Sequence, residues 1–220
     1  MVTYARRGSR FTTRMQAAWE EHAAAYVVPD EAVEAPDVDV QAWFGREAPL
    51  VVEIGSGVGE ATAALAAARP ECNVLALEVW RPGVADTLYR LGVAGATNVR
   101  LLSVDAVWVV GHLLGASSVT ELWSFFPDPW PKTRHHRRRL VTPSFAAIVA
   151  ERLVPGGLWR LATDWADYAD QMVAVLDAEP GLENVHDGPA PRWQDRPVTR
   201  FERRGIDEGR AITDLTYRRL

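Results

Sequence analysis

From Leu50 onward, short apolar segments alternate with Ala-rich segments, and the connections between them are short. The apolar segments have the length and composition of buried strands, and the others have helical composition. Strict alternation of strands and helices predicts a parallel, doubly wound α/β sheet. The expected strands are residues 50–54, 73–78, 99–103, 119–126 and 158–163, and the expected helices are residues 60–68, 84–91, 105–114, 143–153 and 167–176.

The two ends of the chain complete this arrangement. Residues 1–49 are expected to form an N-terminal arm with one Ala-rich helix at 16–26, followed mostly by loop. Residues 182–220 are less regular and are expected to supply two closing strands, the second around residues 211–217. The sequence thus predicts one globular domain at residues 50–220, built on a mostly parallel seven-stranded sheet and preceded by the arm.

Composition excludes several classes of protein. No apolar run approaches the ~18 residues of a membrane span, and the N-terminus lacks the apolar segment of a secretory signal. Cys72 is the single cysteine and the five histidines lack metal-site spacing, so neither a disulfide nor a metal site is expected. A cytoplasmic protein without an obligatory protein partner is the expectation.

The net charge of -5 conceals local basic clusters. Residues 6–14, 132–139 and 192–204 are rich in Arg, which favours a nucleic-acid partner over a merely solvated surface. We expect Arg137, Arg138 and Arg139 to follow a nucleic-acid backbone, although such residues also begin helices. Lys132 is the only Lys among 24 basic residues, which hints at a need for a compact charge there.

A glycine-rich turn, Glu53-Ile54-Gly55-Ser56-Gly57-Val58-Gly59, follows the first expected strand. Its third Gly comes one position too early for a dinucleotide fingerprint, and nearby acids would repel a diphosphate. A ligand with a free amino group would instead be attracted, which favours S-adenosyl-L-methionine over NAD. Glu78 and Asp105 end or follow the next two strands, where they suit ribose hydroxyls and the adenine edge. The alternative is an ordinary glycine turn with acids that cap helices.

A proline-rich loop follows the fourth expected strand. Phe126-Pro127-Asp128-Pro129-Trp130-Pro131 places an acid and an aromatic between prolines, which fix φ and favour extended predecessors. A stiff loop of this kind beside the basic run at 132–139 suggests a site that holds a nucleic-acid base. Trp108, Trp123 and Trp159 are expected in the core, and Thr199 to Glu202 forms a capping box that begins a short helix.

The motifs together resemble the bacterial tRNA (guanine-N7)-methyltransferase family. The resemblance runs from about residue 8 to the end and is carried most specifically by FFPDPWPK and RPVTRFERRG. It implies a Rossmann-like methyltransferase that converts S-adenosyl-L-methionine to S-adenosyl-L-homocysteine while methylating N7 of a guanine in the variable loop of tRNA. It also implies these site residues: Glu53, Gly55, Glu78, Asp105 and Asp128 for the cofactor, Asp128 for catalysis, and Lys132, Asp164, Thr199, Arg200, Phe201 and Glu202 for the tRNA.

Three rival functions share parts of this pattern. An NAD-dependent oxidoreductase is disfavoured by the glycine spacing, and a non-catalytic RNA-binding protein by the intact acids. A methyltransferase of exocyclic amines would carry an Asp/Asn-Pro-Pro-aromatic loop, whereas this chain has Asp-Pro-Trp-Pro after its fourth strand.

Overall fold

The structure of the protein is a computed structural model, and it describes residues 8, 10–34 and 38–220. Arg6 and Arg7 of the first basic cluster lie outside the described residues. No described helix combines the length and the apolar character that a bilayer crossing requires. Nor do the described residues contain a group of three or more His, Cys, Asp and Glu side chains arranged to hold a metal ion.

Seven strands follow the order β3-β2-β1-β4-β5-β7-β6, and only the pairs that involve β7 are antiparallel. This is the expected doubly wound, mostly parallel sheet. The strands are β1 (Leu50–Ile54), β2 (Asn73–Leu77), β3 (Val99–Leu102), β4 (Val119–Phe125), β5 (Leu153–Thr163), β6 (Leu182–Asn184) and β7 (Thr213–Arg219).

Eight α-helices and two 3-10 turns accompany the strands within the described residues. The helices are α1 (Thr13–Tyr26), α2 (Asp30–Val33), α3 (Glu60–Ala68), α4 (Arg81–Ala94), α5 (Ala106–His112), α6 (Pro143–Arg152), α7 (Ala166–Asp177) and α8 (Arg200–Asp207), and the turns are η1 (Ala42–Phe44) and η2 (Thr133–Arg138).

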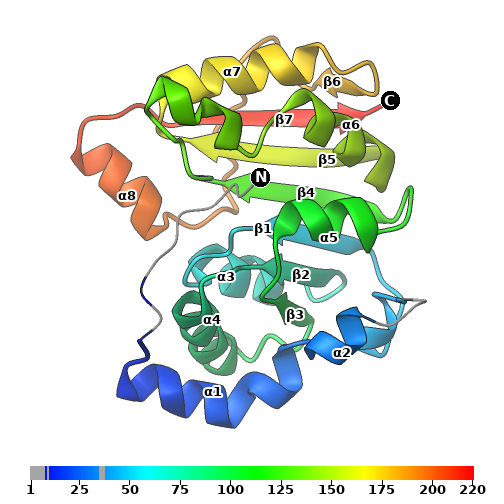
Figure 1. The fold of residues 1–220 in the computed structure, drawn as a ribbon, viewed down its shortest axis with the longest axis vertical. Coiled ribbons are helices and arrows are strands. Elements are labelled where there is room, and N and C mark those ends of the chain that lie inside the picture. Colours follow the sequence, from blue (N-terminus) through cyan, green and yellow to red (C-terminus); the bar gives the residue numbers. More distant parts are fainter. Residues whose placement is uncertain (1–7, 9, 35–37) are drawn as a thin grey trace. The chain divides into compact units, whose positions relative to one another are not determined.

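The chain forms two compact units, each with its own internal contacts. In the N-terminal unit, residues 8–114 and 195–197, β3, β2 and β1 are parallel (Figure 1). Their residues are almost wholly buried. Helix α1 packs along α4, where a Cβ on Gly92 would overlap the ring of His22. A small residue at 92 therefore lets the N-terminal helix lie close against α4.

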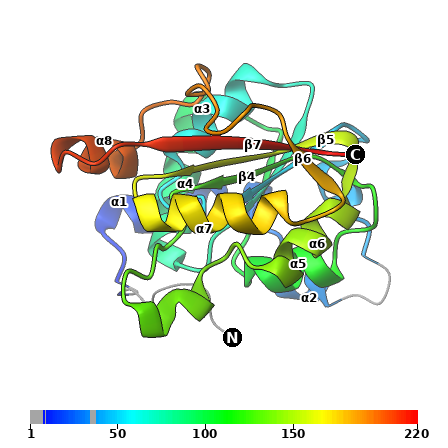
Figure 2. The same cartoon turned by 90° about the horizontal axis from the view of Figure 1, so that it is seen from above.

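In the C-terminal unit, residues 115–194 and 198–220, β5 is the central strand and pairs with β4 and with β7. Figure 2 shows α6 and α7 together on one side of these strands, and α8 beyond the end at which β7 begins. The core of this unit includes Trp123, Trp159 and Tyr217, all fully buried. Helix α8 thus stands at the carboxyl end of β5, the end at which α/β proteins bind ligands.

One expectation about β5 is wrong. The sequence predicts that Pro155, Gly156 and Gly157 precede the strand, but β5 begins at Leu153 and includes them. The pairing with β4 shifts register between Val119 and Glu121, and Gly156 has a φ of 78°. An irregularity in the ladder therefore accommodates the three residues, since bulges tolerate Pro and Gly that regular pairing excludes.

Candidate functional site

The glycine-rich turn of the N-terminal unit joins β1 to α3. Gly55, Gly57 and Gly59 have φ values of 76°, 61° and 76°, in the left-handed region that residues with a Cβ rarely adopt. A Cβ on Gly83, at the start of α4, would overlap the carbonyl oxygen of Gly57. The turn therefore requires glycines for its own conformation, and α4 requires a glycine at position 83 to approach the turn.

Glu78, which directly follows β2, binds the backbone of this turn. Its Oε2 accepts a hydrogen bond from the backbone N–H of Gly57, and its Oε1 accepts one from that of Trp80, each at 2.8 Å. Carboxylate oxygens have further lone pairs, so both remain able to accept hydroxyl groups. Glu78 thus holds the glycine turn and the start of α4 together, a task beyond the ribose contact expected from the sequence.

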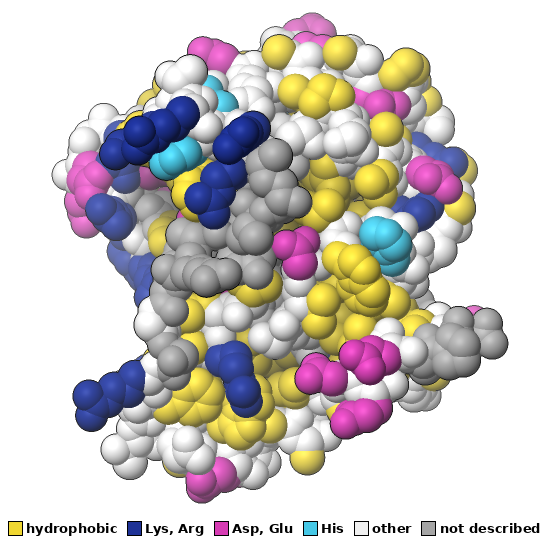
Figure 3. All heavy atoms as spheres, viewed as in Figure 1, with side chains coloured by type: hydrophobic (Ala, Val, Ile, Leu, Met, Phe, Trp, Pro, Cys, Tyr) yellow, Lys and Arg dark blue, Asp and Glu magenta, His cyan; other side chains and the backbone are white. Residues whose placement is uncertain are grey.

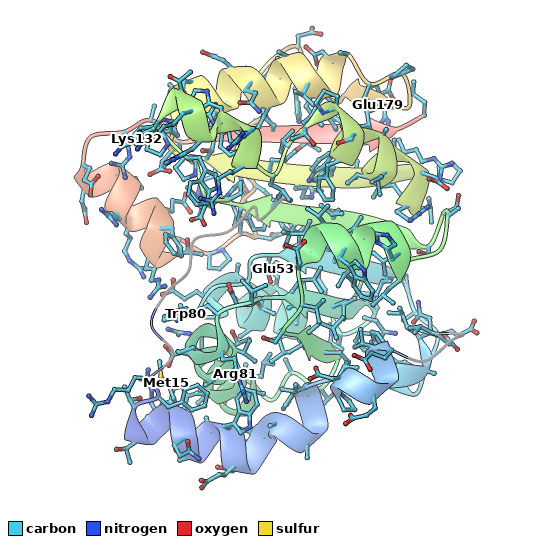
Figure 4. The ribbon with its side chains drawn as sticks, in the orientation of Figure 1. Met15, Glu53, Trp80, Arg81, Lys132 and Glu179 are labelled. Carbon is cyan, nitrogen blue, oxygen red and sulfur yellow. The ribbon has the colours of Figure 1, made fainter. Side chains whose placement is uncertain are left out.

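Glu53 is buried at the end of β1 and accepts a hydrogen bond of 2.5 Å from the hydroxyl of Thr62. Burial raises the pKa of Glu53 to about 7; the Thr62 hydrogen bond opposes this rise and the charge of Glu78 adds to it. This carboxyl therefore takes up a proton near neutral pH. Figure 4 labels Glu53 and Trp80 in the N-terminal unit.

Asp105 caps α5. Its Oδ1 accepts hydrogen bonds from the backbone N–H groups of Val107 at 2.9 Å and of Trp108 at 3.3 Å. The helix-capping alternative is therefore correct for Asp105, and it leaves Oδ2 for an adenine amino group. Trp80 donates through its indole N–H to the carbonyl oxygen of Gly8 at 2.6 Å.

The N-terminal unit fits the expected S-adenosyl-L-methionine. The Ser56 hydroxyl oxygen lies in the glycine turn, buried and without a hydrogen-bond partner among the described residues. A buried polar group of this kind requires a partner, which a polar ligand can supply. At Gly55 the turn is exposed, and a Cβ there would meet nothing within 4 Å, so a ligand has room beside it.

The proline-rich loop of the C-terminal unit differs from its expected form. Phe126 and Trp130, each followed by Pro, have φ values of 54° and 44°, so the prediction of extended predecessors is wrong for both. A non-Gly residue in this region costs on the order of 1–3 kcal/mol and persists only when its surroundings hold it. The backbone N–H of Phe126 donates to the carbonyl oxygen of Ala162 at 2.7 Å, which anchors the first end of the loop. The Arg138 guanidinium lies 3.7 Å from the centre of the Trp130 ring, at the other end.

Asp164, after β5, is ion-paired. Its Oδ2 accepts hydrogen bonds from Arg210 Nε at 2.8 Å and Nη2 at 2.7 Å. Helix α8 approaches so closely that a Cβ on Gly205 would lie 2.9 Å from the Cβ of Asp164. The residue that directly follows β5 is therefore a carboxylate whose charge an arginine already balances.

Glu202 is also ion-paired. It is buried in α8, and both of its oxygens accept hydrogen bonds from Arg192, at 2.7 and 3.1 Å. These hydrogen bonds raise the pKa of Arg192. Thr199 caps α8 by accepting from the backbone N–H of Glu202 at 3.4 Å, so the predicted helix start is confirmed. The Arg200 guanidinium lies 4.8 Å from the centre of the Phe201 ring.

The basic run at 132–139 is exposed or half-buried except at its last residue. Figure 3 shows Lys, Arg and His side chains gathered in the region where Figure 4 labels Lys132. Lys132, Arg134 and Arg137 are exposed, whereas Arg139 is 1% exposed. Desolvation, followed by the charges of Arg134, Arg138 and neighbouring cations, lowers the pKa of His135, so its ring is mainly neutral at pH 7. The expectation that Arg139 follows a nucleic-acid backbone is wrong, because the side chain is buried.

The expected core position is confirmed for two of the three Trp residues. Trp123 and Trp159 are fully buried, but Trp108 is 40% exposed and stacks on His112, so the prediction for Trp108 is wrong. The sequence did not indicate that Arg139, Arg192 and Arg210 bind acidic side chains. Their partners are Asp167, Glu202 and Asp164. The DPWP and RFERRG motifs drew attention to the acids, but no local spacing indicated which arginines would bind them.

Comparisons with known proteins agree with this architecture. A family model described as "Putative methyltransferase" matches residues 47–215. A tRNA (guanine-N(7)-)-methyltransferase of Nocardioides sp. (strain ATCC BAA-499 / JS614) is 65% identical over the whole chain and 87% of its own length. A protein of the same name from Cutibacterium acnes is 50% identical over the whole chain and 83% of its own length.

Solved structures share the fold at low sequence identity. The 16S rRNA methyltransferase KamB superposes with a TM-score of 0.58 at 18% identity, covering 97% of this chain and 96% of its own. A 16S rRNA (adenine(1408)-N(1))-methyltransferase mutant from Catenulisporales acidiphilia, solved with cosubstrate SAM, gives 0.55 at 16% identity, covering 88% of this chain and 92% of its own.

Proposed function

The chain belongs to the tRNA (guanine-N7)-methyltransferase family, and from this premise we propose that it methylates N7 of a guanine in the variable loop of tRNA. S-adenosyl-L-methionine is the cofactor and supplies a methyl group activated on a sulfonium. Guanine N7 presents an unprotonated lone pair in the major groove, so the attack requires no general base. The protein's task is to orient the base and to stabilise the charge that the ring acquires.

In the proposed assignment, Asp128 is the catalytic residue and also borders the cofactor. A carboxylate that accepts from the guanine amino and N1–H edge offsets the positive charge of the methylated ring. Asp164 is the second candidate for this contact: Arg210 binds its Oδ2, and Oδ1 has no hydrogen-bond partner among the described residues. The loop geometry around Asp128, with left-handed residues on both sides, supports the first choice, because strain of this kind concentrates at functional sites.

The remaining residues hold the two substrates. We assign Glu53, Gly55, Glu78 and Asp105 to S-adenosyl-L-methionine, with Glu78 accepting from ribose hydroxyls. We assign the tRNA to Lys132 and Asp164 and to the segment at the start of α8, namely Thr199, Arg200, Phe201 and Glu202. Within that segment Glu202 is buried against Arg192, so it acts by orienting its neighbours rather than by direct exposure to the base.

The observation that best supports the proposal is the way Glu78 holds the glycine turn. The Glu78 carboxylate accepts hydrogen bonds from two backbone N–H groups, which are neutral donors, and carboxylate oxygens can accept from hydroxyl donors as well. A dinucleotide site would instead present the helix N-terminus to a diphosphate, and here Glu60 occupies the first turn of α3. This donor set favours an amino-acid-bearing nucleoside over NAD.

The test is incubation of the purified chain with unmodified tRNA and S-adenosyl-L-methionine, followed by nucleoside mass spectrometry against standards methylated at N7, N1 and N2. N7-methylguanosine is the expected product, and mapping should place it in the variable loop. Methyl groups only at other atoms, or none, would reject the proposal. Because the chain is used alone, product formation also tests the proposal that no obligatory protein partner is needed. A tRNA substrate is consistent with a cytoplasmic enzyme.

A further inference from the structure

The guanidinium of Arg139 is buried among four hydrogen-bond partners of the C-terminal unit. Its Nε donates to the carbonyl oxygen of Pro129 at 2.8 Å, and Nη1 donates to Gln171 Oε1 at 2.7 Å. Its Nη2 donates to Asp167 Oδ2 at 2.7 Å and to His136 Nε2 at 3.1 Å. A planar guanidinium presents these donors in a fixed fork, so it sets the spacing of its partners.

Three of the four partners of Arg139 belong to the two segments that carry the candidate acids. Pro129 directly follows Asp128 in the proline-rich loop. Asp167 and Gln171 lie in the first turns of α7, which begins two residues after Asp164. One side chain therefore fixes the loop of Asp128 relative to the helix that follows Asp164.

The ring of Tyr168 supports the guanidinium from α7. It lies 4.8 Å from the Arg139 Cζ, and the Tyr168 hydroxyl accepts from the backbone N–H of Val141 at 3.1 Å. Burial raises the pKa of Tyr168 to about 12, so the hydroxyl stays neutral at working pH. Gln171 donates to the carbonyl oxygen of Val141 at 3.1 Å, so the partners of Arg139 are themselves held.

The proline-rich loop requires contacts from outside itself to hold its strained backbone. Trp130 is in the left-handed region, and the carbonyl that Arg139 binds belongs to the residue directly before it. We infer that Arg139 is a positioning residue for methyl transfer, which acts by holding Asp128 and Asp164 at their working separation. This inference rests on the proposed function of the site and assigns Arg139 no contact with substrate.

The test compares Arg139→Lys with Arg219→Lys as a matched control. Lysine keeps the charge but replaces the fork by a single ammonium group, which does not reproduce four directed contacts. Arg219 belongs to the same unit and binds Ser117 and the carbonyl oxygen of Leu153, at the start of β5 and away from Thr163. Each variant is assayed for melting temperature, for the dissociation constants of S-adenosyl-L-methionine and tRNA, and for the single-turnover methylation rate at saturating concentrations.

We expect Arg139→Lys to lose about 100-fold in single-turnover rate, the effect of a misplacement of about 1 Å. Both dissociation constants should stay within about threefold of the wild-type values, and Arg219→Lys should keep its rate. A rate for Arg139→Lys within about threefold of wild type would overturn the inference. So would an equal loss of rate in both variants, because that pattern indicates a general loss of stability.

A second variant covers the case in which Arg139→Lys does not fold. Asp167 is half-exposed, and Asp167→Asn weakens only the tether to α7. We expect about a tenfold slower single turnover at an unchanged melting temperature, and an unchanged rate would contradict the inference. Wild-type protein that makes no N7-methylguanosine would reject the proposed function itself, whereas an active wild type with fully active variants rejects only the role of Arg139.

Discussion

The two units hold their candidate acids by different means. In the N-terminal unit, backbone N–H groups bind Glu78 and Asp105, and a hydroxyl binds Glu53. In the C-terminal unit, Arg210 binds Asp164 and Arg192 binds Glu202. Neutral donors do not balance the charge of an ionised acid, whereas an arginine does. Glu53 differs from Glu78 and Asp105, because its raised pKa of about 7 lets it take up a proton near neutral pH.

This difference matches the ligands proposed for each unit. S-adenosyl-L-methionine carries an ammonium, a sulfonium and ribose hydroxyls, all of which are attracted by uncompensated carboxylates. A tRNA is a polyanion, and uncompensated carboxylates would repel it. The C-terminal unit can therefore offer carboxylates to a base while presenting little negative charge to the phosphates.

Asp128→Asn provides the largest test of this contrast. We expect turnover to fall about 100- to 1,000-fold, because the amide no longer offsets the charge on the methylated ring. The melting temperature should stay unchanged, since the residue lies on a loop. Methyl incorporation and thermal unfolding are measured together, with Asp187→Asn as the control on an exposed loop of the same unit. Near-normal turnover would remove Asp128 from the mechanism.

Glu53→Gln tests whether an uncompensated acid in the N-terminal unit destabilises the fold. The folded-state pKa of about 7 lies above the ordinary value of 4.5, so the folded protein binds this proton more tightly than the unfolded chain. The free energy of unfolding should therefore fall as pH rises from about 4.5 to about 7 and then level off, by on the order of 3 kcal/mol relative to Glu53→Gln.

Urea unfolding of both proteins across this pH range measures the difference. Glu47→Gln, an exposed substitution in the same unit, is the control and should track the wild type. A difference between wild type and Glu53→Gln that does not vary with pH would show that Glu53 titrates normally.

Glu78→Gln should weaken the binding of S-adenosyl-L-methionine more than the binding of tRNA. The amide nitrogen replaces one acceptor, so a backbone N–H of Gly57 or Trp80 is left without its acceptor and a ribose hydrogen bond is weakened. We expect S-adenosyl-L-methionine to bind roughly 10- to 100-fold more weakly, since hydrogen bonds to charged groups contribute about 1.5–3 kcal/mol. Calorimetry for the cofactor and filter binding for tRNA measure the two affinities; equal losses in both would contradict the division of labour.

Replacing Arg134, Arg137 and Arg138 together by Gln should weaken tRNA binding and leave cofactor binding intact. For every duplex phosphate that an arginine no longer neutralises, the slope of log affinity against log salt should decrease by roughly 0.9. Arg139 is left in place because it is buried. An unchanged slope in salt titrations would mean that the run is only a solvated surface.

Lys132→Arg should have the smallest effect. The lone Lys suggested from the sequence that a compact charge is needed at this position. The side chain is exposed at the start of η2, however, so a guanidinium has room there. We expect methylation within about threefold of wild type and a modest loss of tRNA affinity for Lys132→Ala. Steady-state kinetics at two salt concentrations compare the variants, and a large loss in the Arg variant would instead indicate a shape-specific contact.

Sequence periodicity was sufficient for the fold. The strand at 50–54 and the helix at 60–68 have the predicted bounds, because burial pattern and composition act locally. Glu78, Asp105, Asp128 and Asp164 were also predictable as a set, since each follows a strand. Their partners were not: Arg139 lies 28 residues from Asp167, and Arg210 lies 46 from Asp164. Only the folded chain determines which of 23 arginines reaches which acid.

The edge strands of the two units leave little backbone open to other chains. Strand β6 has three residues, and β3 has four. Beside β3, the backbone N–H of Val28 donates to the carbonyl oxygen of Leu101 at 3.0 Å, so the chain after α1 occupies part of that edge. Short and covered edges oppose the strand-to-strand association that leads to aggregation. At β3 and β6, the described part of the chain therefore offers few free backbone groups with which a second copy could extend the sheet.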